Sequence, residues 1–542
     1  MSRLNACLGT EYTIDISEDA SEALQLCISQ NYDFGTAYGL LRGTWKQLNC
    51  PEVERPRLKD RLDLEKIENR RLQQDLQYLK QDMSEQLVIA SPFSIRPRRV
   101  WDLRSHRVIP WESADLETPN LWAISHSWVK ESERHMVKTA VNGYEWPIPV
   151  PCGVTLEAVR NELLRYGAEY CWLDVLCLRQ DAESGAKGPT EQMRAIEWAI
   201  DVPTIGNVYF GDLKVLRYYN GLGRPFKTSG WESEFHWTNR AWTLQESKRG
   251  SITGGTPDGY TNKQSVVVIE DGRYEGMNKE EFEHSKSYTG ISELLEIRAP
   301  AHFLRQGDAP LKVIRTACGL FGVLREMQHR NARRDVDKVA AIGFLMSNPK
   351  VTIPAFWENI DIETAWTRCV RHMTPTMRDE LLFRYPEPGD QNHLWFPSWT
   401  QIRDHELPED PVGPFCYRDK GGSCTSPNST TYKYFGYVIA AADITGLGIS
   451  TGGKRSGILT VEREGQSSVQ FLVSAYHKHP IPDGRYSLVR RMESHDFVVC
   501  SYSDRARHHS FVDLDKVSVL CVEFDESKFK QAGAILRSCK FI

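Results

Sequence analysis

The sequence lacks the patterns of three classes of protein. None of its 13 cysteines forms a C-x-x-C pair, and they are scattered and odd in number. This spacing fits reduced thiols better than a zinc site or a disulfide framework. No apolar run reaches about 18 residues, and the N-terminus has no basic flank followed by an apolar core. We therefore expect a cytoplasmic protein with no membrane span.

An excess of positive charge is also missing. The formal net charge is −5 and the isoelectric point is near 6.3, which argues against an extended nucleic-acid surface. No internal repeat or low-complexity tract stands out. The remaining composition, 40% hydrophobic and 26% charged, is typical of globular proteins. At about 150 residues per unit, 542 residues predict three or four units.

Changes in hydrophobic spacing and composition divide the chain into four regions. Residues 1–96 predict a helical N-terminal region, 251–400 a mainly helical middle region, and 401–542 a mainly β region. Within the first region, the stretch Pro56 to Leu87 places apolar residues at helical spacing: Leu72, Leu76, Leu79 and Met83. That stripe predicts either a coiled-coil dimer or a helix packed on its own chain.

The remaining region, 97–250, alternates short apolar runs with helical segments. "LWAISHSW" and "YCWLDVLCL" have strand length, "VTLEAVRNELLRYG" and "EQMRAIEWAI" have helical spacing, and "NVYFGDLKVLRYYN" reads as one or two further strands. This alternation predicts an α/β fold with a parallel sheet covered by helices. Ligands of such sheets sit beyond the carboxyl ends of the strands, where Ser125, His126 and Asp174 fall.

Asp174 needs a partner, because it lies inside an apolar run and an unpaired carboxylate is costly to bury. The sequence offers two arrangements: Asp174 faces the cleft at the end of its strand, or it pairs with Arg179 or Arg240. His126 follows the first strand and either orients substrate hydroxyls or is a satisfied loop residue. Cys177 reads as strand interior, which argues against a thiol nucleophile.

Trp242 and Glu246 are four residues apart in "NRAWTLQESKR". At this spacing both side chains fall on one helix face, so the indole could form an apolar wall beside the carboxylate. Such a wall raises a carboxylate's pKa and suits it to catalysis. The alternative is a packing motif with a buried tryptophan and a solvated glutamate.

Four phrases, in order and at their separations, resemble the fungal heterokaryon-incompatibility (HET) domain family. They are "LWAISHSW", "YCWLDVLCLRQ", "DVPTIGNVYFGD" and "NRAWTLQE", within residues 97–250. "RRDVDKVAAIGFL" and "LWFPSW" are similar to segments farther along longer members. One departure is Val129, where family members usually have a glycine after the aromatic residue. Without that glycine, close approach of the backbone to a phosphate is not expected at this loop.

The resemblance implies a protein of non-self recognition that triggers cell death. It also implies a distant likeness to Toll/interleukin-1 receptor (TIR) domains, which have a flavodoxin-like fold and of which some hydrolyse NAD. "WTLQE" aligns with their motif, placing Trp242 on its tryptophan and Glu246 on its catalytic glutamate.

The sequence therefore predicts one possible catalytic residue, Glu246, with NAD as a possible substrate and neither a metal nor a bound cofactor. The substrate-binding residues that we predict beside it are Ser125, His126, Ser127, Trp128, Asp174, Arg240 and Trp242. Self-association or a partner protein is expected as well. Two alternatives stay open: a recognition scaffold without catalysis, and a HET-type fold recruited to specialised metabolism with another small substrate.

Overall fold

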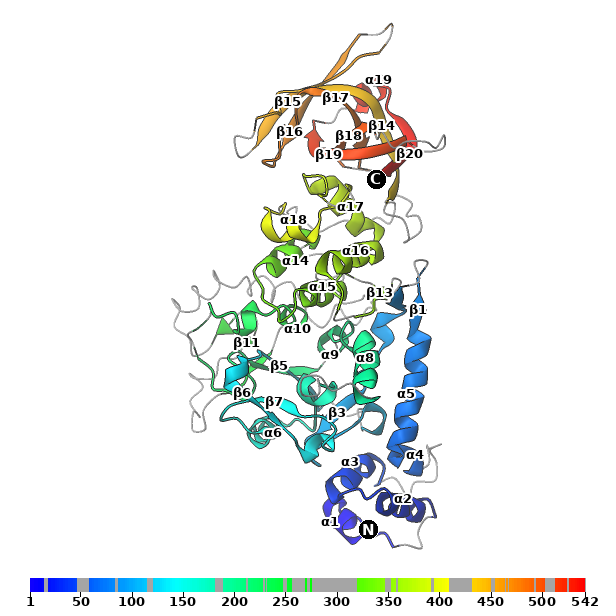
Figure 1. The fold of residues 1–542 in the computed structure, drawn as a ribbon, viewed down its shortest axis with the longest axis vertical. Helices are drawn as coiled ribbons and strands as arrows, with labels where there is room; N and C mark the ends of the chain where they lie inside the picture. The colour runs from blue at the N-terminus through cyan, green and yellow to red at the C-terminus, as the bar shows by residue number, and fades with distance from the viewer. Residues whose placement is uncertain are drawn as a thin grey trace.

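Four regions follow one another along the longest axis of the molecule in the computed structural model (Figure 1). The fold is mixed α/β, with several sheets and a mainly β C-terminal region. The residues that the structure describes are 1–13, 18–45, 58–82, 86–114, 120–180, 189–210, 213–227, 230, 232–246, 251–255, 269–270, 273–274, 319–346, 352–356, 359–390, 394–408, 431–449, 454–463, 465, 467–491, 494–502, 512–523 and 526–541.

Helices dominate the N-terminal region, as predicted. They are α1 (Ser2–Leu8), α2 (Glu18–Ser29), α3 (Phe34–Trp45), α4 (Leu58–Leu62) and α5 (Leu64–Tyr78). In α2 the buried residues Ala20, Ala23 and Cys27 recur at helical spacing. They share a core cluster with Val100 and Tyr170, so these helices pack on the α/β region.

Strands close the N-terminal region, which the helical prediction did not include. They are β1 (Leu79–Gln81) and β2 (Leu87–Ile89), and β2 pairs on its other side with β13 (Ile353–Pro354). The resulting antiparallel sheet joins the N-terminal region to the middle region.

The prediction that the leucines of Pro56 to Leu87 form one helical stripe packed on their own chain is wrong, whereas the coiled-coil dimer stays a prediction. The buried face of α5 consists of Ile67, Arg71 and Asp75, whereas Leu76 is 55% exposed. Leu72 is only partly buried, Leu79 begins β1, and Met83 lies outside the described residues.

Buried ion pairs hold α5 instead. The Arg98 guanidinium lies 2.6 Å from Asp75 and 2.9 Å from Asp201, and Arg71 lies 3.1 Å from Asp75. Arg99 contacts Glu197 at 2.7 Å. Charged side chains therefore occupy the helix face that apolar periodicity alone assigned to solvent.

A six-stranded sheet forms the centre of the α/β region. Its strands are β3 (Arg99–Asp102), β4 (Arg107–Pro110), β5 (Leu121–His126), β8 (Tyr170–Trp172), β9 (Lys214–Tyr218) and β10 (Ile252–Thr253). Their order is β10-β9-β5-β8-β3-β4. The first four are parallel, with Trp122 opposite Cys171 and Ile124 opposite Leu216, and β3 is antiparallel to β8 and β4. The predicted parallel sheet is thus present, with an antiparallel hairpin at one edge.

Helices and short elements connect these strands. The helices are α6 (Leu156–Arg165), α7 (Asp174–Cys177), α8 (Pro189–Asp201), α9 (Gly206–Phe210) and α10 (Thr243–Glu246). The hairpin β6 (Arg134–Val137) and β7 (Ile148–Pro151) stands apart from the sheet. The 3₁₀ turns are η2 (Pro92–Ser94), η3 (Trp111–Ser113), η4 (Glu131–Glu133), η5 (Ala140–Asn142) and η6 (Trp237–Asn239).

Two predicted strands are shorter than expected. "YCWLDVLCL" is a strand only to Trp172, because the chain turns into α7 at Asp174, whose carboxylate accepts the Val175 N–H at 2.7 Å. A carboxylate inside the sheet would have no such partner. "NVYFGDLKVLRYYN" is the end of α9 followed by the single strand β9.

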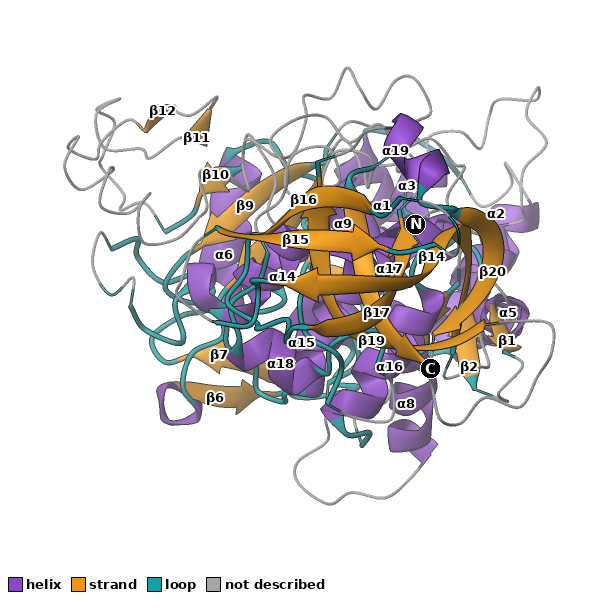
Figure 2. Cartoon of the chain, turned by 90° about the horizontal axis from the view of Figure 1, so that it is seen from above, coloured by secondary structure: helices purple, strands orange, loops and turns teal. Residues whose placement is uncertain are grey.

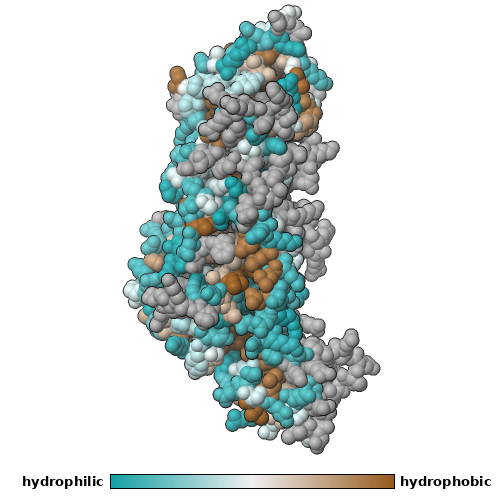
Figure 3. Space-filling model, turned by 45° about the vertical axis from the view of Figure 1, so that its right-hand side comes forward, coloured by the Kyte–Doolittle hydropathy of each residue, from teal (hydrophilic) through white to brown (hydrophobic). Residues whose placement is uncertain are grey.

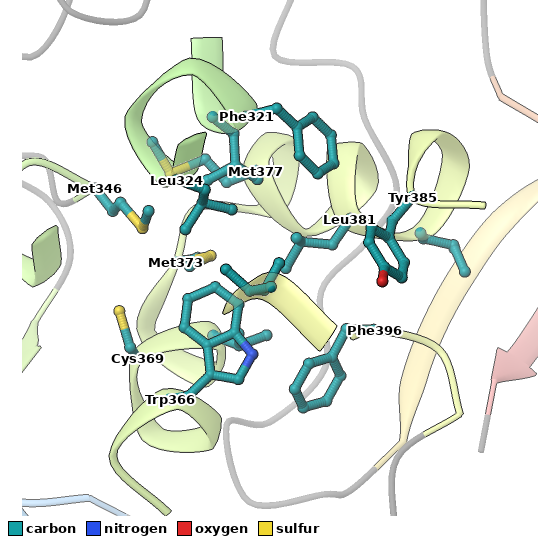
Figure 4. Packing of buried hydrophobic residues seen from close by; sticks show 14 of the residues in the cluster. Phe321, Leu324, Met346, Trp366, Cys369, Met373, Met377, Leu381, Tyr385 and Phe396 are labelled. Carbon is teal, nitrogen blue, oxygen red and sulfur yellow. The ribbon is translucent and has the colours of Figure 1, made fainter. Parts of the chain in front are cut away.

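The middle region is helical where the structure describes it. Its helices are α14 (Gly319–Gln328), α15 (Val336–Gly343), α16 (Ile362–His372), α17 (Pro375–Arg384) and α18 (Trp399–Asp404). Figure 4 shows their core, where Trp366, Leu381 and Phe396 face one another. The Trp366 indole N–H donates to the Pro397 carbonyl at 2.7 Å. Most of the predicted loop between Ser251 and Tyr288 lies outside the described residues, apart from β10 and the short pair β11 (Ile269–Glu270) and β12 (Arg273–Tyr274).

The C-terminal region is mainly β, as predicted. Its strands are β14 (Tyr432–Thr445), β15 (Arg455–Val461), β16 (Val469–Ala475), β17 (Gly484–Arg490), β18 (Asp496–Tyr502), β19 (Val512–Val522) and β20 (Ile535–Phe541), with the helix α19 (Glu526–Gln531). The sheet curls so that β14 also pairs with β15, and β19 with β20 (Figure 2). Buried and exposed residues alternate along β15 and β16, the pattern of strands with one solvated face.

On the face shown in Figure 3, hydrophilic residues cover most of the described surface and hydrophobic ones gather in patches. Within the described ranges, none of the helices combines the length and apolar character needed to cross a bilayer.

Replacing the shared cation of the buried ion network should destabilise the protein. Arg98→Met leaves the buried Asp201 without this partner, so we expect the free energy of unfolding to fall by about 3–5 kcal/mol. Urea denaturation followed by far-UV circular dichroism measures the change. Arg104→Met is the matched control, because the Arg104 side chain is 55% exposed, and it should change the value by less than about 0.5 kcal/mol. Equal effects of the two variants would contradict a stabilising role for the network.

Candidate active site

A cavity of about 420 Å³ opens at the carboxyl ends of β5 and β8. Aromatic side chains and charged side chains of both signs line it. The aromatic lining residues are Trp128, Trp172, Trp198, Tyr209, Phe235, Trp242 and Phe356. The charged lining residues are Lys130, Glu131, Arg134, Asp174, Glu234, Arg240, Glu246, Arg333, Arg334 and Asp337, with His126 among them when protonated. Such a volume suits a small organic ligand with an aromatic ring and polar ends.

Most of the predicted site residues meet at this cavity. The six that line it are His126, Trp128, Asp174, Arg240, Trp242 and Glu246. Ser125 and Ser127 are buried behind the wall, 0% and 1% exposed. Ser125 contacts Glu246, whereas the Ser127 hydroxyl donates to the Tyr219 carbonyl at 3.1 Å and holds the loop after β5 against β9.

Glu246 is held by a short chain of hydrogen bonds. The Ser125 hydroxyl donates to Glu246 Oε2 at 2.6 Å and accepts from the Trp237 indole N–H, also at 2.6 Å. Because Trp237 can only donate, the Ser125 proton must point to the carboxylate. Within the part of the chain that the structure describes, no residue donates to the other carboxylate oxygen, Oε1. Glu246 therefore has one fixed oxygen and one without a protein partner, on a residue that lines the cavity.

Burial is the main influence on the charge of Glu246. Desolvation raises the pKa of the Glu246 carboxyl to about 7, and the negative charge of Asp174 acts in the same direction. The Ser125 hydrogen bond and the positive charges of His126 and Arg217 oppose this rise. Near neutral pH both the protonated and the ionised form of the carboxyl are consequently populated.

Trp242 is less buried than predicted. Its ring is only partly buried because it lines the cavity, and it meets Phe356 edge-on with 6.4 Å between ring centroids. The helical turn α10 begins one residue later, at Thr243, but Trp242 and Glu246 still line the same cavity. The tryptophan therefore contributes to the cavity wall as well as to the core.

His126 and Asp174 form an ion pair across the ends of β5 and β8. His126 Nε2 lies 2.7 Å from Asp174 Oδ1, and Nδ1 lies 3.1 Å from the Ser127 carbonyl. Both partners of the ring are acceptors, so both ring nitrogens donate and the imidazole is charged. Burial alone would lower the pKa of His126, but the Asp174 charge outweighs it and the pKa is raised. Burial would likewise raise the pKa of Asp174, yet His126 holds it below its usual value.

The arginine partners proposed for Asp174 are wrong. Its second oxygen accepts the Trp128 indole N–H at 3.1 Å, so His126 and Trp128 are its side-chain partners. Arg179 instead contacts Glu145 and Glu68, at 2.9 and 3.0 Å. The short helix α7 explains the difference, because it turns the chain away from the sheet directly after Asp174.

Sequence reasoning missed the part of the site that the middle region supplies. Asn331, Ala332, Arg333, Arg334 and Asp337 line the cavity opposite the sheet. The backbone joins the two sides, since Ala241 N–H donates to the Asn331 carbonyl at 2.9 Å. The only signal in the sequence was the motif "RRDVDKVAAIGFL". It is similar to a segment of longer HET proteins, but that similarity does not indicate where the segment lies relative to the sheet.

Val129 fills space on the loop where the family usually has glycine. It is 8% exposed, and a Cβ atom on Gly221 would lie 2.6 Å from its Cγ1 atom. Gly221 also has a φ of +114°, which side chains rarely adopt. The close contact between the two loops therefore requires a glycine at position 221, on the loop after β9, and leaves room for Val129 beside Trp128.

Neither a metal site nor a thiol nucleophile is evident at the cavity. Burial raises the pKa of the Cys177 thiol to about 12, so the thiolate is unavailable at neutral pH. Three or more metal-ligating side chains do not converge anywhere in the described ranges.

Comparison with protein-family models, with curated proteins and with solved structures found no match to this chain. The likeness to the HET family therefore stays a prediction from the sequence motifs.

Glu246→Gln should change stability in a pH-dependent way. In the folded protein the pKa of Glu246 is about 7, against an ordinary value of 4.5, so the folded state binds the proton more tightly. The stability this provides is complete below pH 4.5 and is lost as the pH rises through 7. We expect nearly equal stability of the two proteins at pH 4.5 and an advantage of about 3 kcal/mol for the variant at pH 8.5.

Urea denaturation at both pH values measures this difference. Glu157→Gln is the control for removal of a carboxylate, because this side chain is 54% exposed on α6 and does not line the cavity. An advantage of Glu246→Gln that is the same at both pH values would show that burial does not perturb this carboxyl.

Proposed function

We propose that the protein hydrolyses the N-glycosidic bond of a nucleotide such as NAD, with Glu246 as the catalytic carboxylate. The observation that carries this proposal is the position of Glu246, whose partly exposed carboxyl is fixed by Ser125 in a cavity lined by aromatic and charged side chains. The proposal agrees with the alignment of "WTLQE" on the catalytic motif of TIR-like enzymes.

The reaction needs few groups, and this cavity contains them. The bond between the nicotinamide nitrogen and the ribose breaks, and its electron pair leaves with nicotinamide, which departs neutral without a general acid. An oxocarbenium-like ribose remains, and the Glu246 carboxylate stabilises its positive charge. Water then adds to the sugar carbon and releases a proton, which gives ADP-ribose.

In this scheme His126 and Asp174 hold neighbouring side chains in place and do not transfer protons. Both nitrogens of His126 already donate to protein acceptors, and both oxygens of Asp174 already accept. The pair fixes the ring of Trp128, which stacks beside His126 with centroids 6.3 Å apart. The aromatic side chains then offer a flat surface to nicotinamide.

The strand order supports a flavodoxin- or TIR-like assignment of this region. Numbered from β5, the parallel strands β8, β5, β9 and β10 follow the order 2-1-3-4. Flavodoxin-like sheets begin in this order and bind ligands where the direction of winding reverses, between the first and third strands. In this chain that point lies between β5 and β9, and the cavity opens next to it, at the ends of β5 and β8, with His126 contributed by β5.

Consumption of NAD would connect this activity to a role in non-self recognition and cell death, the biology that the four motifs imply. The chemistry and the biological role are separable, and the chemistry is the part that the cavity supports.

Nicotinamide release from NAD tests the proposal. Wild-type protein should release nicotinamide, measured by chromatography, and Glu246→Gln should lower turnover by about a hundredfold or more, because the neutral amide cannot stabilise the oxocarbenium centre. Activity should rise with pH through 7, since the carboxylate is the working form and its pKa is about 7.

Glu157→Gln, on the surface of α6, should retain full turnover. A Glu246→Gln variant with wild-type turnover would refute the role of Glu246. Intact NAD after incubation with the wild-type protein, both as purified and after concentration, would refute NAD hydrolysis itself.

A further inference from the structure

Among the residues that the structure describes, the Arg240 guanidinium at the cavity has no hydrogen-bond or ion-pair partner. None of them forms a ring contact with Arg240 either. Its backbone is nevertheless well held, since its carbonyl accepts from Arg330 at 2.9 Å and the residue bridges to Asn331. These backbone contacts hold Arg240 in a position where its side chain lines the cavity.

The neighbouring arginines differ from Arg240. Arg134 and Arg333 share Glu131, at 3.1 and 3.4 Å, and Arg134 also lies over the Trp128 ring. Arg330 is buried and bonds to backbone and to Thr243. These arginines have structural partners, whereas the guanidinium of Arg240 has none in the described part of the chain.

A desolvated charge with no partner opposes folding. Burial lowers the pKa of Arg240, whereas the charges of Asp337, Glu234 and Glu246 raise it and keep the group ionised. None of these three carboxylates comes within 4 Å of the guanidinium to form an ion pair. The protein therefore retains a solvation cost at this position that a bound anion would offset.

We propose that Arg240 binds a phosphate group of the substrate, at a subsite between the α10 segment and the loop Asn331–Arg334. This inference rests on the proposed function and defines its substrate class as a phosphorylated nucleotide rather than a free nucleoside. The planar guanidinium presents paired N–H donors that match two phosphate oxygens. Arg333 and Arg334 line the same cavity on the side of the middle region, together with Asp337.

The arrangement separates the two ends of the ligand. Trp242 and Phe356 offer aromatic surface, while Arg240 takes the phosphate and Glu246 faces the sugar between them. Arg240 and Glu246 lie on one short segment, so the distance between the phosphate and the reacting carbon would be set by a single stretch of backbone.

Binding measurements on the full-length protein test the subsite. The probes are inorganic pyrophosphate, ADP-ribose and nicotinamide riboside, which carries no phosphate, measured by isothermal titration calorimetry. Arg240→Gln should weaken the binding of pyrophosphate and ADP-ribose by at least tenfold and should leave nicotinamide riboside within about twofold of wild type. Arg240→Lys, which keeps the charge but loses the paired donors, should fall between the two.

Three controls separate the possible explanations. Arg104→Gln removes an exposed arginine outside the cavity and should bind all probes as wild type does. Thermal unfolding of Arg240→Gln should be no lower than that of wild type, because the variant loses an unpaired charge, so weaker binding would not reflect misfolding. Glu246→Gln should keep the affinity for pyrophosphate while losing turnover.

Two failures are distinguishable. Wild-type affinity of Arg240→Gln for pyrophosphate and ADP-ribose, or no measurable binding of either probe to the wild-type protein, overturns the phosphate subsite whatever the enzyme does to NAD. Wild-type turnover in Glu246→Gln overturns the proposed hydrolysis and leaves the subsite to be judged on binding alone.

Discussion

The site depends on a backbone pairing between two regions that are distant in the sequence. The Asn331 N–H donates to the Asn239 carbonyl at 2.6 Å, and the Ala241 N–H donates to the Asn331 carbonyl at 2.9 Å. Buried Arg330 reinforces the pairing, because its guanidinium donates to the Arg240 carbonyl at 2.9 Å and to the Thr243 hydroxyl at 3.0 Å. Without these bonds the segment that carries Arg240 and Glu246 would be a surface loop beside the sheet. With them it becomes a wall between the sheet and the helical middle region.

Buried charge has two different roles in this molecule. In the network around α5 each cation meets carboxylates at short range, as Arg98 does with Asp75 and Asp201, so the charges neutralise one another. At the cavity, Glu246 has one hydrogen-bonded oxygen, and Arg240 has no partner among the residues that the structure describes. Groups of the first kind fix the relation between regions, and groups of the second kind are left with interactions to offer a ligand. Incomplete pairing, rather than burial itself, distinguishes the candidate site from the scaffold.

The sequence was sufficient for the parts of the fold that depend on local pattern. The apolar runs and helical spacings predicted the parallel sheet, α6 and α8, the helices of the middle region and the β character of the last region. They also placed His126 and Asp174 at one edge of the sheet. The prediction from periodicity is wrong for α5, where Arg71 and Asp75 are buried and Leu76 is exposed. Periodicity is read from apolar residues alone, so it does not indicate which charged residues form ion pairs with distant parts of the chain.

The same limit explains what was missed at the cavity. Trp237 looked like one of many tryptophans, yet its indole N–H orients the Ser125 hydroxyl toward Glu246. Residues 331–337 lie between two predicted helical stretches and nothing local placed them near the sheet, yet they complete the cavity. Both contributions arise from contacts more than 80 residues apart, which no local spacing encodes. Since one side of the cavity comes from beyond residue 318, the region 97–250 contains Glu246 and all strands of the sheet except β10, but only part of the cavity lining. The chemistry proposed for Glu246 is therefore a property of two regions together, and the middle region belongs to the site as much as the sheet does.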